Sequence, residues 1–252
     1  MIRKLFLVFL LVPVMHPGFV SGNSPPAGEL TAAQILEKNA AARGGLQAWK
    51  AVQTMTMSGK LEAGGTQNVE LPFVLRLKRP RKSRMELDFR GQAAVQVYDG
   101  TNGWKARPFL NRKDVEPYTP EELKAATQQS DLDGPLMDAV ARGYAVELEG
   151  TQTVEGRKAY NLKITRKDAQ VRHVWVDADT FLELKIEGTP RQLDGKYHPV
   201  HMYLREYRTV SGLKIPYVIE TAVDGVKQTE KIRIQEVVIN PSLQDSLFTK
   251  PS

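Results

Sequence analysis

The feature that most constrains this sequence is an alternation of apolar and polar residues, which begins near residue 55 and continues, with one interruption, to the end of the chain. From Leu71 to Leu77 and from Ile215 to Ile219, every second residue is apolar. A period of two places these side chains on one face of a strand. Residues that favour turns, such as Asp99-Gly100 and Asp224-Gly225, separate the runs at hairpin spacing. The pattern predicts about 10–11 antiparallel strands, because parallel strands would need helices between most of them.

Several segments outside the alternation favour helices. Thr31 to Gln34 has the form of a capping box before an alanine-rich run that Gly44-Gly45 ends. The residues from Leu46 to Lys50 resume helical geometry. In the middle of the chain, residues 119–122 have the threonine, proline and glutamate spacing of a helix N-terminus. Residues 133–140 predict a further helix after a loop.

These elements predict an α+β protein with a single antiparallel sheet. A sheet of that many strands curls into an incomplete barrel. The helices are expected to cover its apolar concave face, but too few helical residues are predicted to fill a wide concavity. We therefore expect a hydrophobic cavity, and the alternative is a fully packed core.

The N-terminal residues have the composition of a secretory signal peptide. Arg3 and Lys4 precede an apolar run from Leu5 to Met15, and small residues lead to Gly22. We expect cleavage after Gly22, so that residues 1–22 are the signal peptide and residues 23–252 form one domain without an internal linker. The alternative is an uncleaved helix, which the prolines in this segment disfavour.

Composition narrows the functional classes. No other stretch approaches the ~20 apolar residues of a spanning helix, so we expect a soluble exported protein. The count of 0 cysteines removes disulfides and any lipid-acceptor cysteine. The formal charge of +6 is modest, and its basic residues are scattered among acids. That distribution argues against nucleic acid as a partner.

The sequence lacks the motifs of common catalytic sites. It contains no phosphate-binding loop, nucleophile elbow, dinucleotide fingerprint or zinc-protease motif. His198 and His201, with His173, are the best candidates for metal ligands, but positions three apart on a strand point to opposite faces. We therefore expect no catalytic residue, no cofactor and no metal. A pocket that holds a buried carboxylate pair remains an alternative that the sequence does not reveal.

An ordered set of motifs resembles one protein family. An apolar strand ends in Leu77-Lys78-Arg79-Pro80, a turn and tryptophan strand follow from Asp99 to Trp104, and a Pro108-Phe109 loop comes next. The segments Val210 to Pro216 and Asn240 to Pro251 complete the set. This order resembles the periplasmic lipoprotein carrier of the Lol pathway and the wider lipoprotein-sorting superfamily.

The resemblance implies a half-barrel whose helices form a lid over a cavity for acyl chains. It places Arg79 where a hydrogen bond joins the barrel to the lid, with a solvated strand-end charge as the alternative. It places Leu136 and Met137 on the lid, where methionine suits flexible ligands. The residues expected to bind lipid are Phe73, Leu75, Leu77, Met85, Leu87, Phe89, Val95, Val97, Trp104, Phe109, Leu136, Met137 and Trp175.

The resemblance further implies a periplasmic carrier that shields an acylated lipoprotein or a phospholipid and acts as a monomer. Its other partners would be an inner-membrane donor and an outer-membrane acceptor protein. Burial is worth ~0.8 kcal/mol per CH₂, so an acyl chain cannot cross water unshielded at a useful rate. The alternative function is a periplasmic sensor that binds a protein partner in response to mislocalised lipoproteins.

Overall fold

Thirteen strands pair in antiparallel fashion in one open sheet of this computed structural model, which describes residues 30–62, 69–108 and 112–251. The bounds of the strands and helices, in chain order, are α1 Ala32–Ala42, α2 Leu46–Ala51, β1 Thr54–Glu62, β2 Glu70–Lys78, β3 Lys82–Phe89, β4 Gln92–Tyr98, β5 Gly103–Arg107, β6 Arg112–Pro117, α3 Pro120–Gln129, β7 Ala145–Val154, β8 Arg157–Thr165, β9 Val171–Asp177, β10 Glu183–Glu187, β11 Arg191–Leu193, β12 Lys196–His198, β13 Val200–Val210, β14 Leu213–Val223, β15 Glu230–Ile239 and the short 3₁₀ helix η2 Asp245–Phe248. The predicted α+β class with one open antiparallel sheet is confirmed.

The sheet contains more strands than the alternation predicted. Its order is β6-β5-β4-β3-β2-β1-β15-β14-β13-β10-β9-β8-β7, and β11 and β12 form a separate ribbon. The strands β6 and β7, which the sequence pattern missed, are the two edges of the sheet. Charged residues are common on edge strands, where they discourage pairing with other chains. In β7 the apolar alternation is short, because only Val146 and Leu148 alternate with Glu147 and Glu149 before Gly150.

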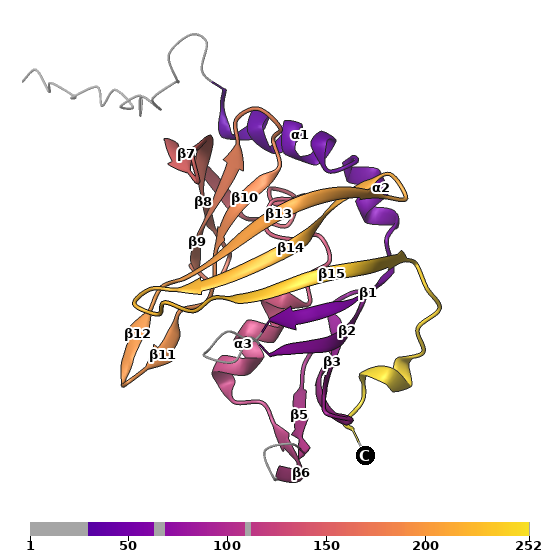
Figure 1. Cartoon of the computed structure of the whole chain (residues 1–252). Coiled ribbons are helices and arrows are strands. Elements are labelled where there is room, and N and C mark those ends of the chain that lie inside the picture. Colours follow the sequence, from indigo (N-terminus) through magenta and orange to yellow (C-terminus); the bar gives the residue numbers. More distant parts are fainter. Residues whose placement is uncertain (1–29, 63–68, 109–111, 252) are drawn as a thin grey trace, which may run out of the picture. The chain divides into compact units, whose positions relative to one another are not determined.

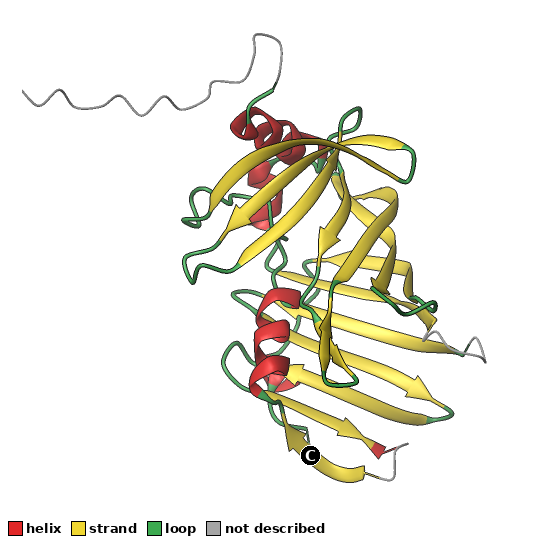
Figure 2. Ribbon diagram, turned by 90° about the vertical axis from the view of Figure 1, so that its left-hand side faces the viewer, coloured by secondary structure: helices red, strands yellow, loops and turns green. Residues whose placement is uncertain are grey.

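The connections explain how the inner face becomes covered. Strand β1 pairs with β15, so the N-terminal and C-terminal strands lie side by side in the middle of the sheet (Figure 1). The edge strands β6 and β7 are consecutive in the sequence, and α3 and residues 130–144 connect them. This connection runs from one edge of the sheet to the other. Figure 2 shows the helices gathered along one side of the strands.

Register defines the two faces of the sheet. Met55 pairs with Leu77 on one side and with Ile239 on the other, and Leu75 pairs with Met85. Directly opposite residues of paired strands lie on the same face. We call this face the inner face and the opposite one the outer face.

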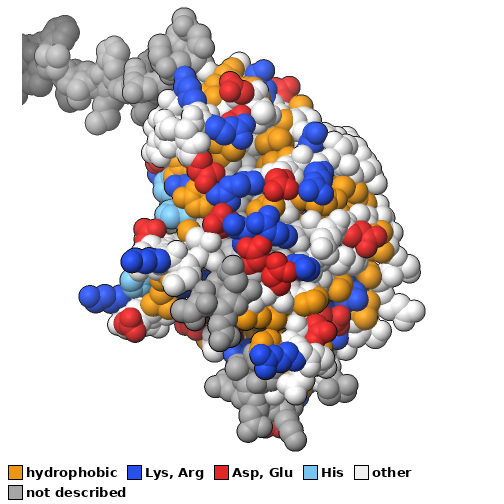
Figure 3. Space-filling view, viewed as in Figure 1, with side chains coloured by type: hydrophobic (Ala, Val, Ile, Leu, Met, Phe, Trp, Pro, Cys, Tyr) orange, Lys and Arg blue, Asp and Glu red, His pale blue; other side chains and the backbone are white. Residues whose placement is uncertain are grey.

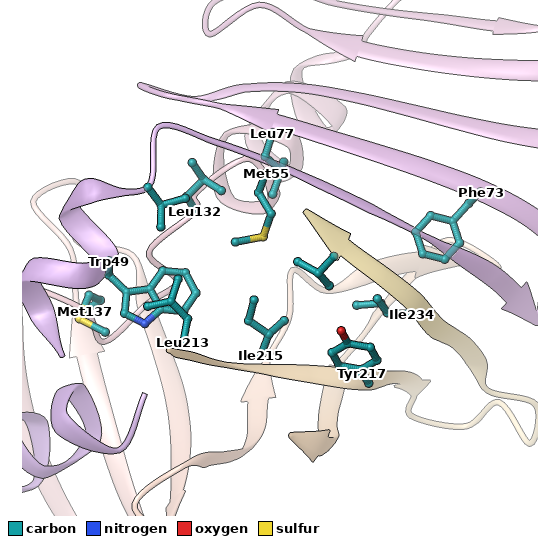
Figure 4. Packing of buried hydrophobic residues seen from close by; sticks show 12 residues of the cluster. Trp49, Met55, Phe73, Leu77, Leu132, Met137, Leu213, Ile215, Tyr217 and Ile234 are labelled. Carbon is teal, nitrogen blue, oxygen red and sulfur yellow. The ribbon is translucent and has the colours of Figure 1, made fainter. Parts of the chain in front are cut away.

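The main core lies on the inner face. Its buried members come from α2 and the residue that follows it, from the four strands β1, β2, β14 and β15, and from the connection after α3, and Figure 4 shows their side chains pointing toward one another. They are Trp49, Val52, Met55, Phe73, Leu77, Leu132, Met137, Leu213, Ile215, Tyr217, Ile234 and Val237. Residues distant in sequence are thus held together by one apolar cluster.

Two predicted helix starts have the expected caps. Thr31 and Thr119 each accept a hydrogen bond from the backbone of the third helical residue, Gln34 and Glu122, whose side chains bond back to the cap. The helix predicted over residues 133–140 is wrong, because residues 132–143 form turns instead. Gly134 has φ of 73° and Asp138 has φ of 55° in this segment. Such left-handed backbone angles cannot continue a right-handed helix.

The C-terminal segment packs on the outer face of β3, and with the outer face of β4–β6 it lines a cavity of about 520 Å³. Phe248 of η2 is buried, and Arg84 of β3 donates a hydrogen bond to the carbonyl of Leu247. Lys78 and Lys82 both form ion pairs with Asp245. The strands at this end of the sheet are therefore covered on both faces, since α3 packs on the inner face of β4 and β5.

Candidate ligand-binding face and its lid

Residues 130–143, which we call the lid segment, lie on the inner face. Three of their apolar side chains are almost fully buried: Leu132 is 7%, Leu136 2% and Met137 1% exposed, whereas Val140 is 66% exposed. Figure 4 shows Leu132 and Met137 close to Trp49 and Leu213. The lid segment has no helix or strand of its own, so side-chain contacts must hold it in place.

Arg79 links the end of the sheet to the lid segment. It follows β2, and its guanidinium donates hydrogen bonds to both carboxylate oxygens of Asp133, at 2.8 and 2.5 Å. The same side chain donates to the carbonyls of Val52, at 2.6 Å, and Trp49, at 3.0 Å. The hydrogen bonds with Asp133 hold the pKa of Arg79 above its ordinary value. One planar guanidinium thus joins β2, α2 and the lid segment.

Arg43 holds the same part of the lid segment from the opposite side. It caps α1 and donates to the backbone carbonyl of Asp133 at 3.0 Å. It also pairs with the buried Glu183 of β10 at 3.2 Å and lies over the ring of Trp49, 4.2 Å from the centroid. Burial and the charge of Glu183 raise the pKa of Tyr207, whose hydroxyl donates to the Glu183 carbonyl.

Two further ion pairs fix the rest of the lid segment. Lys50 of α2 pairs with Asp138 at 2.7 Å. Arg142 pairs with Asp131 at 2.7 Å and donates to the carbonyls of Gly134 and Met137. Burial lowers the pKa of Arg142, but Asp131, Tyr144 and Asp133 together outweigh this effect, and the pKa lies above its ordinary value. Polar contacts at the margin therefore hold the apolar centre of the lid segment against the sheet.

A band of half-buried apolar side chains surrounds the covered core. Met57, Leu75, Met85, Leu87 and Ile232 pack against the main cluster and are only partly buried. They come from four neighbouring strands, β1, β2, β3 and β15, and share the inner face. A continuous apolar band that includes unbranched methionines can adapt to a flexible hydrocarbon.

The described residues do not suggest a metal centre. They contain no group of three or more histidine, aspartate and glutamate side chains placed to hold a metal ion. His173 contacts Glu187 at 2.6 Å, whereas His198 contacts the carbonyl of Asp224 at 2.8 Å. His201 lies edge-on to Trp175. The part of the chain described here also has no helix long and apolar enough to cross a membrane.

Comparison with known proteins places the chain in a family. The family model described as "-like: Uncharacterized protein" matches residues 115–252, which is more than half of the chain. The chain belongs to this family. A search of the curated proteins finds no match.

Solved structures share the fold. A LolA superfamily protein from Nitrosomonas europaea is 16% identical with a TM-score of 0.58, and the match covers 88% of this chain and 99% of that one. A domain named for outer-membrane lipoprotein sorting, from Vibrio parahaemolyticus, is 12% identical with a TM-score of 0.58 and coverages of 87% and 96%. A DUF1329 family protein from Desulfovibrio piger is 14% identical with a TM-score of 0.57 and coverages of 86% and 97%. The family member described here therefore has a LolA-like carrier fold.

The structure separates the residues expected to bind lipid into two sets. Most lie on the inner face or on the lid segment: Phe73, Leu75, Leu77, Met85, Leu87, Phe89, Leu136 and Met137. Four lie on the outer face instead: Val95, Val97, Trp104 and Trp175. Phe109 lies outside the described residues.

The outer-face residues on β4 and β5, namely Val95, Val97 and Trp104, have a common physical explanation. Val97 pairs with Arg84 and Trp104, whereas the neighbouring Tyr98 turns inward and contacts Thr127 of α3. Strand β4 is apolar on both faces because α3 covers one and the C-terminal segment the other. Alternation alone cannot orient such a strand. Trp175 belongs to a separate small cluster with Val154, Ala159 and Leu184.

Sequence reasoning missed three residues that position the lid segment. Arg43, Trp49 and Asp133 are 6 and 84 positions apart in the sequence, and only the fold brings them together. Arg43 precedes the Gly44-Gly45 pair that ends α1, where the chain passes closely over the Gly212 carbonyl. The glycine pair is the signal that the sequence offered for this close approach, because a side chain at Gly44 would collide with the Gly212 carbonyl.

Proposed function

We propose that this protein is a periplasmic carrier or binder of lipoproteins or lipids, which shields acyl chains on the inner face beneath the lid segment. The observation that carries the proposal is the lid segment itself. It has no regular structure, it is held at its margin by Arg79, Arg43 and Lys50, and it covers an apolar face with Leu132, Leu136 and Met137. The LolA-like fold supports the same function.

The energies suit reversible binding. Burial of one large apolar side chain is worth about 1.5–3 kcal/mol, so displacement of the three lid side chains costs roughly 5–9 kcal/mol. A long acyl chain gains on the order of 10 kcal/mol by leaving water. The cost of displacing the lid side chains therefore nearly equals the gain from burying the acyl chain. A carrier needs such a balance because it must also release its cargo to an acceptor.

The cellular setting belongs to the proposal. We infer export through the N-terminal signal peptide, cleavage after Gly22 and action between an inner-membrane donor and an outer-membrane acceptor. Acidic and basic side chains are interspersed on the surface in Figure 3, which leaves no dense basic stripe on that face. This distribution suits transient contacts with membranes or proteins better than permanent attachment.

Native mass spectrometry of the protein purified gently from periplasm tests this function. We expect a chain that begins at Asn23 and carries phospholipid or an acylated protein, identified by lipid extraction. The variant Leu87→Asp should lose the lipid, because it places a charge in the apolar band. Val238→Asp is the matched control, since Val238 lies on the outer face of β15 and is 41% exposed.

A protein without bound lipid, which also takes up none on titration with lipid or lipopeptide, would contradict the carrier function. That result would favour the protein-binding sensor instead. Equal lipid loss in Leu87→Asp and Val238→Asp would argue against the inner face as the binding surface.

A further inference from the structure

A cavity of about 160 Å³ lies between α3 and strands β9 and β10. Its lining is basic and polar on one side, with Lys124, Arg166 and Arg172, and its rim includes the exposed Val171 and Pro190. Arg172 pairs across the sheet with Ile164, next to Leu162 and Val174, whose side chains are buried on the inner face. The cavity therefore lies at the border of the inner face.

Among the described residues, the basic side chains that line the cavity outnumber the acidic ones. Arg172 donates to the side-chain carbonyl of Gln128, which also accepts from Thr189, and it forms no ion pair with a described residue. Lys124 is exposed and likewise forms no ion pair within the described parts of the chain. Uncharged amides thus stand where a carboxylate would normally neutralise a half-buried arginine.

The acids nearest to the cavity do not neutralise its positive charge. Asp168 lies 3.8 Å from the Arg166 Nε atom, and that nitrogen is buried without a hydrogen-bond partner. Glu187 also lines the cavity, but its carboxylate accepts from the backbone and ring nitrogens of His173. Burial and the positive charge of Arg166 lower the pKa of Arg172. The cavity accordingly holds an excess of positive charge.

We propose that this cavity binds a phosphate group, namely that of a lipid whose acyl chain occupies the inner face. Two arginines and a lysine line it, and arginine forks match phosphate oxygens. An anion there would neutralise Arg172, which forms no ion pair with a described residue. The apolar rim at Val171 would contact the adjoining glycerol or acyl atoms. The assignment of a lipid rests on the proposed carrier function, whereas the phosphate site itself does not.

Calorimetric titration of the mature protein tests the site with two probes, inorganic phosphate and short-chain phosphatidylglycerol. We expect Arg172→Gln to weaken phosphatidylglycerol binding about tenfold or more, since a hydrogen bond to a charged group is lost. Arg166→Gln should have a similar effect and serves if Arg172→Gln does not fold. Lys158→Gln, an exposed charge at the far end of β8, is the matched control and should bind like the parent protein.

The outcomes separate the possible sources of the phosphate group. Tighter binding of phosphatidylglycerol than of inorganic phosphate, with both weakened by Arg172→Gln, supports a lipid headgroup. Equal binding of the two probes, weakened by Arg172→Gln, supports the phosphate site but contradicts the lipid assignment. Binding that Arg172→Gln and Arg166→Gln leave unchanged overturns the site.

Monooleoylglycerol, an uncharged lipid, distinguishes this inference from the proposed function. Uptake of monooleoylglycerol without any effect of Arg172→Gln on phosphatidylglycerol would overturn the phosphate site and leave the carrier function intact. Failure to bind either lipid, with retained and Arg172-dependent binding of inorganic phosphate, would contradict the carrier function and support the site as a phosphate site alone.

Discussion

Replacing Trp49 by alanine should lower the free energy of unfolding by about 3–5 kcal/mol, the usual range for truncating a buried aromatic side chain. Trp49 is 2% exposed and belongs to the main cluster. Its indole nitrogen donates to the Arg43 carbonyl at 3.0 Å, and its ring lies beneath the Arg43 guanidinium. The substitution therefore removes a packed ring and also the support of an arginine that holds the lid segment. Chemical denaturation of the mature protein measures the change.

The variant Trp49→Phe provides a graded comparison. It keeps most of the apolar volume but loses the hydrogen bond to Arg43, so we expect a loss of about 1–2 kcal/mol. If Trp49→Ala cost less than 1 kcal/mol, α2 and the lid segment would not form part of the cooperative core, contrary to the packing described above.

Replacing Arg79 by alanine should release the lid segment. The change removes two hydrogen bonds to Asp133 and two to backbone carbonyls. Loss of about 1.5–3 kcal/mol of local stability would speed amide hydrogen exchange in residues 130–143 by about ten- to a hundredfold. Because the closed lid segment competes with the ligand, the variant should also bind an uncharged lipid more tightly. Hydrogen exchange followed by mass spectrometry, with a lipid titration, measures both effects.

Arg191→Ala is a matched control for Arg79→Ala. Arg191 forms a comparable two-bond pair with Glu230, at 2.7 Å for each bond, but both side chains are 43% exposed and lie away from the lid segment. Exposed pairs contribute little, so exchange in residues 130–143 should not change. If both variants left exchange in the lid segment unaltered, Arg79 would not hold it closed.

Alternation in the sequence identifies a strand best when only one face of that strand is buried. In strands β1 and β2, the alternation of Met55, Met57, Phe73 and Leu75 corresponds to side chains that share one face of the sheet. The two capping boxes located α1 and α3 because their hydrogen bonds are local. Edge strand β7 was missed because its apolar alternation covers only Val146 and Leu148 before Gly150.

The candidate site was less accessible from the sequence because long-range contacts build it. Asp133 lies in a turn and becomes significant only where Arg79 and Arg43 meet it. Val95 and Val97 have the same spacing as Met85 and Leu87, yet they face outward because β4 is covered on both sides. The resemblance to the lipoprotein carrier placed Arg79 at a link to the lid, and the structure gives that link its partners.

Photo-crosslinking with a diazirine-bearing acyl probe, mapped by mass spectrometry, tests the central claim most directly. The claim is that an acyl chain occupies the inner face beneath the lid segment. We predict crosslinks at Met57, Leu75, Met85 or Leu87 and at Leu136 or Met137, and we predict that they increase in Arg79→Ala. Crosslinks confined to outer-face residues such as Val95 or Trp175, or unaffected by Arg79→Ala, would contradict it.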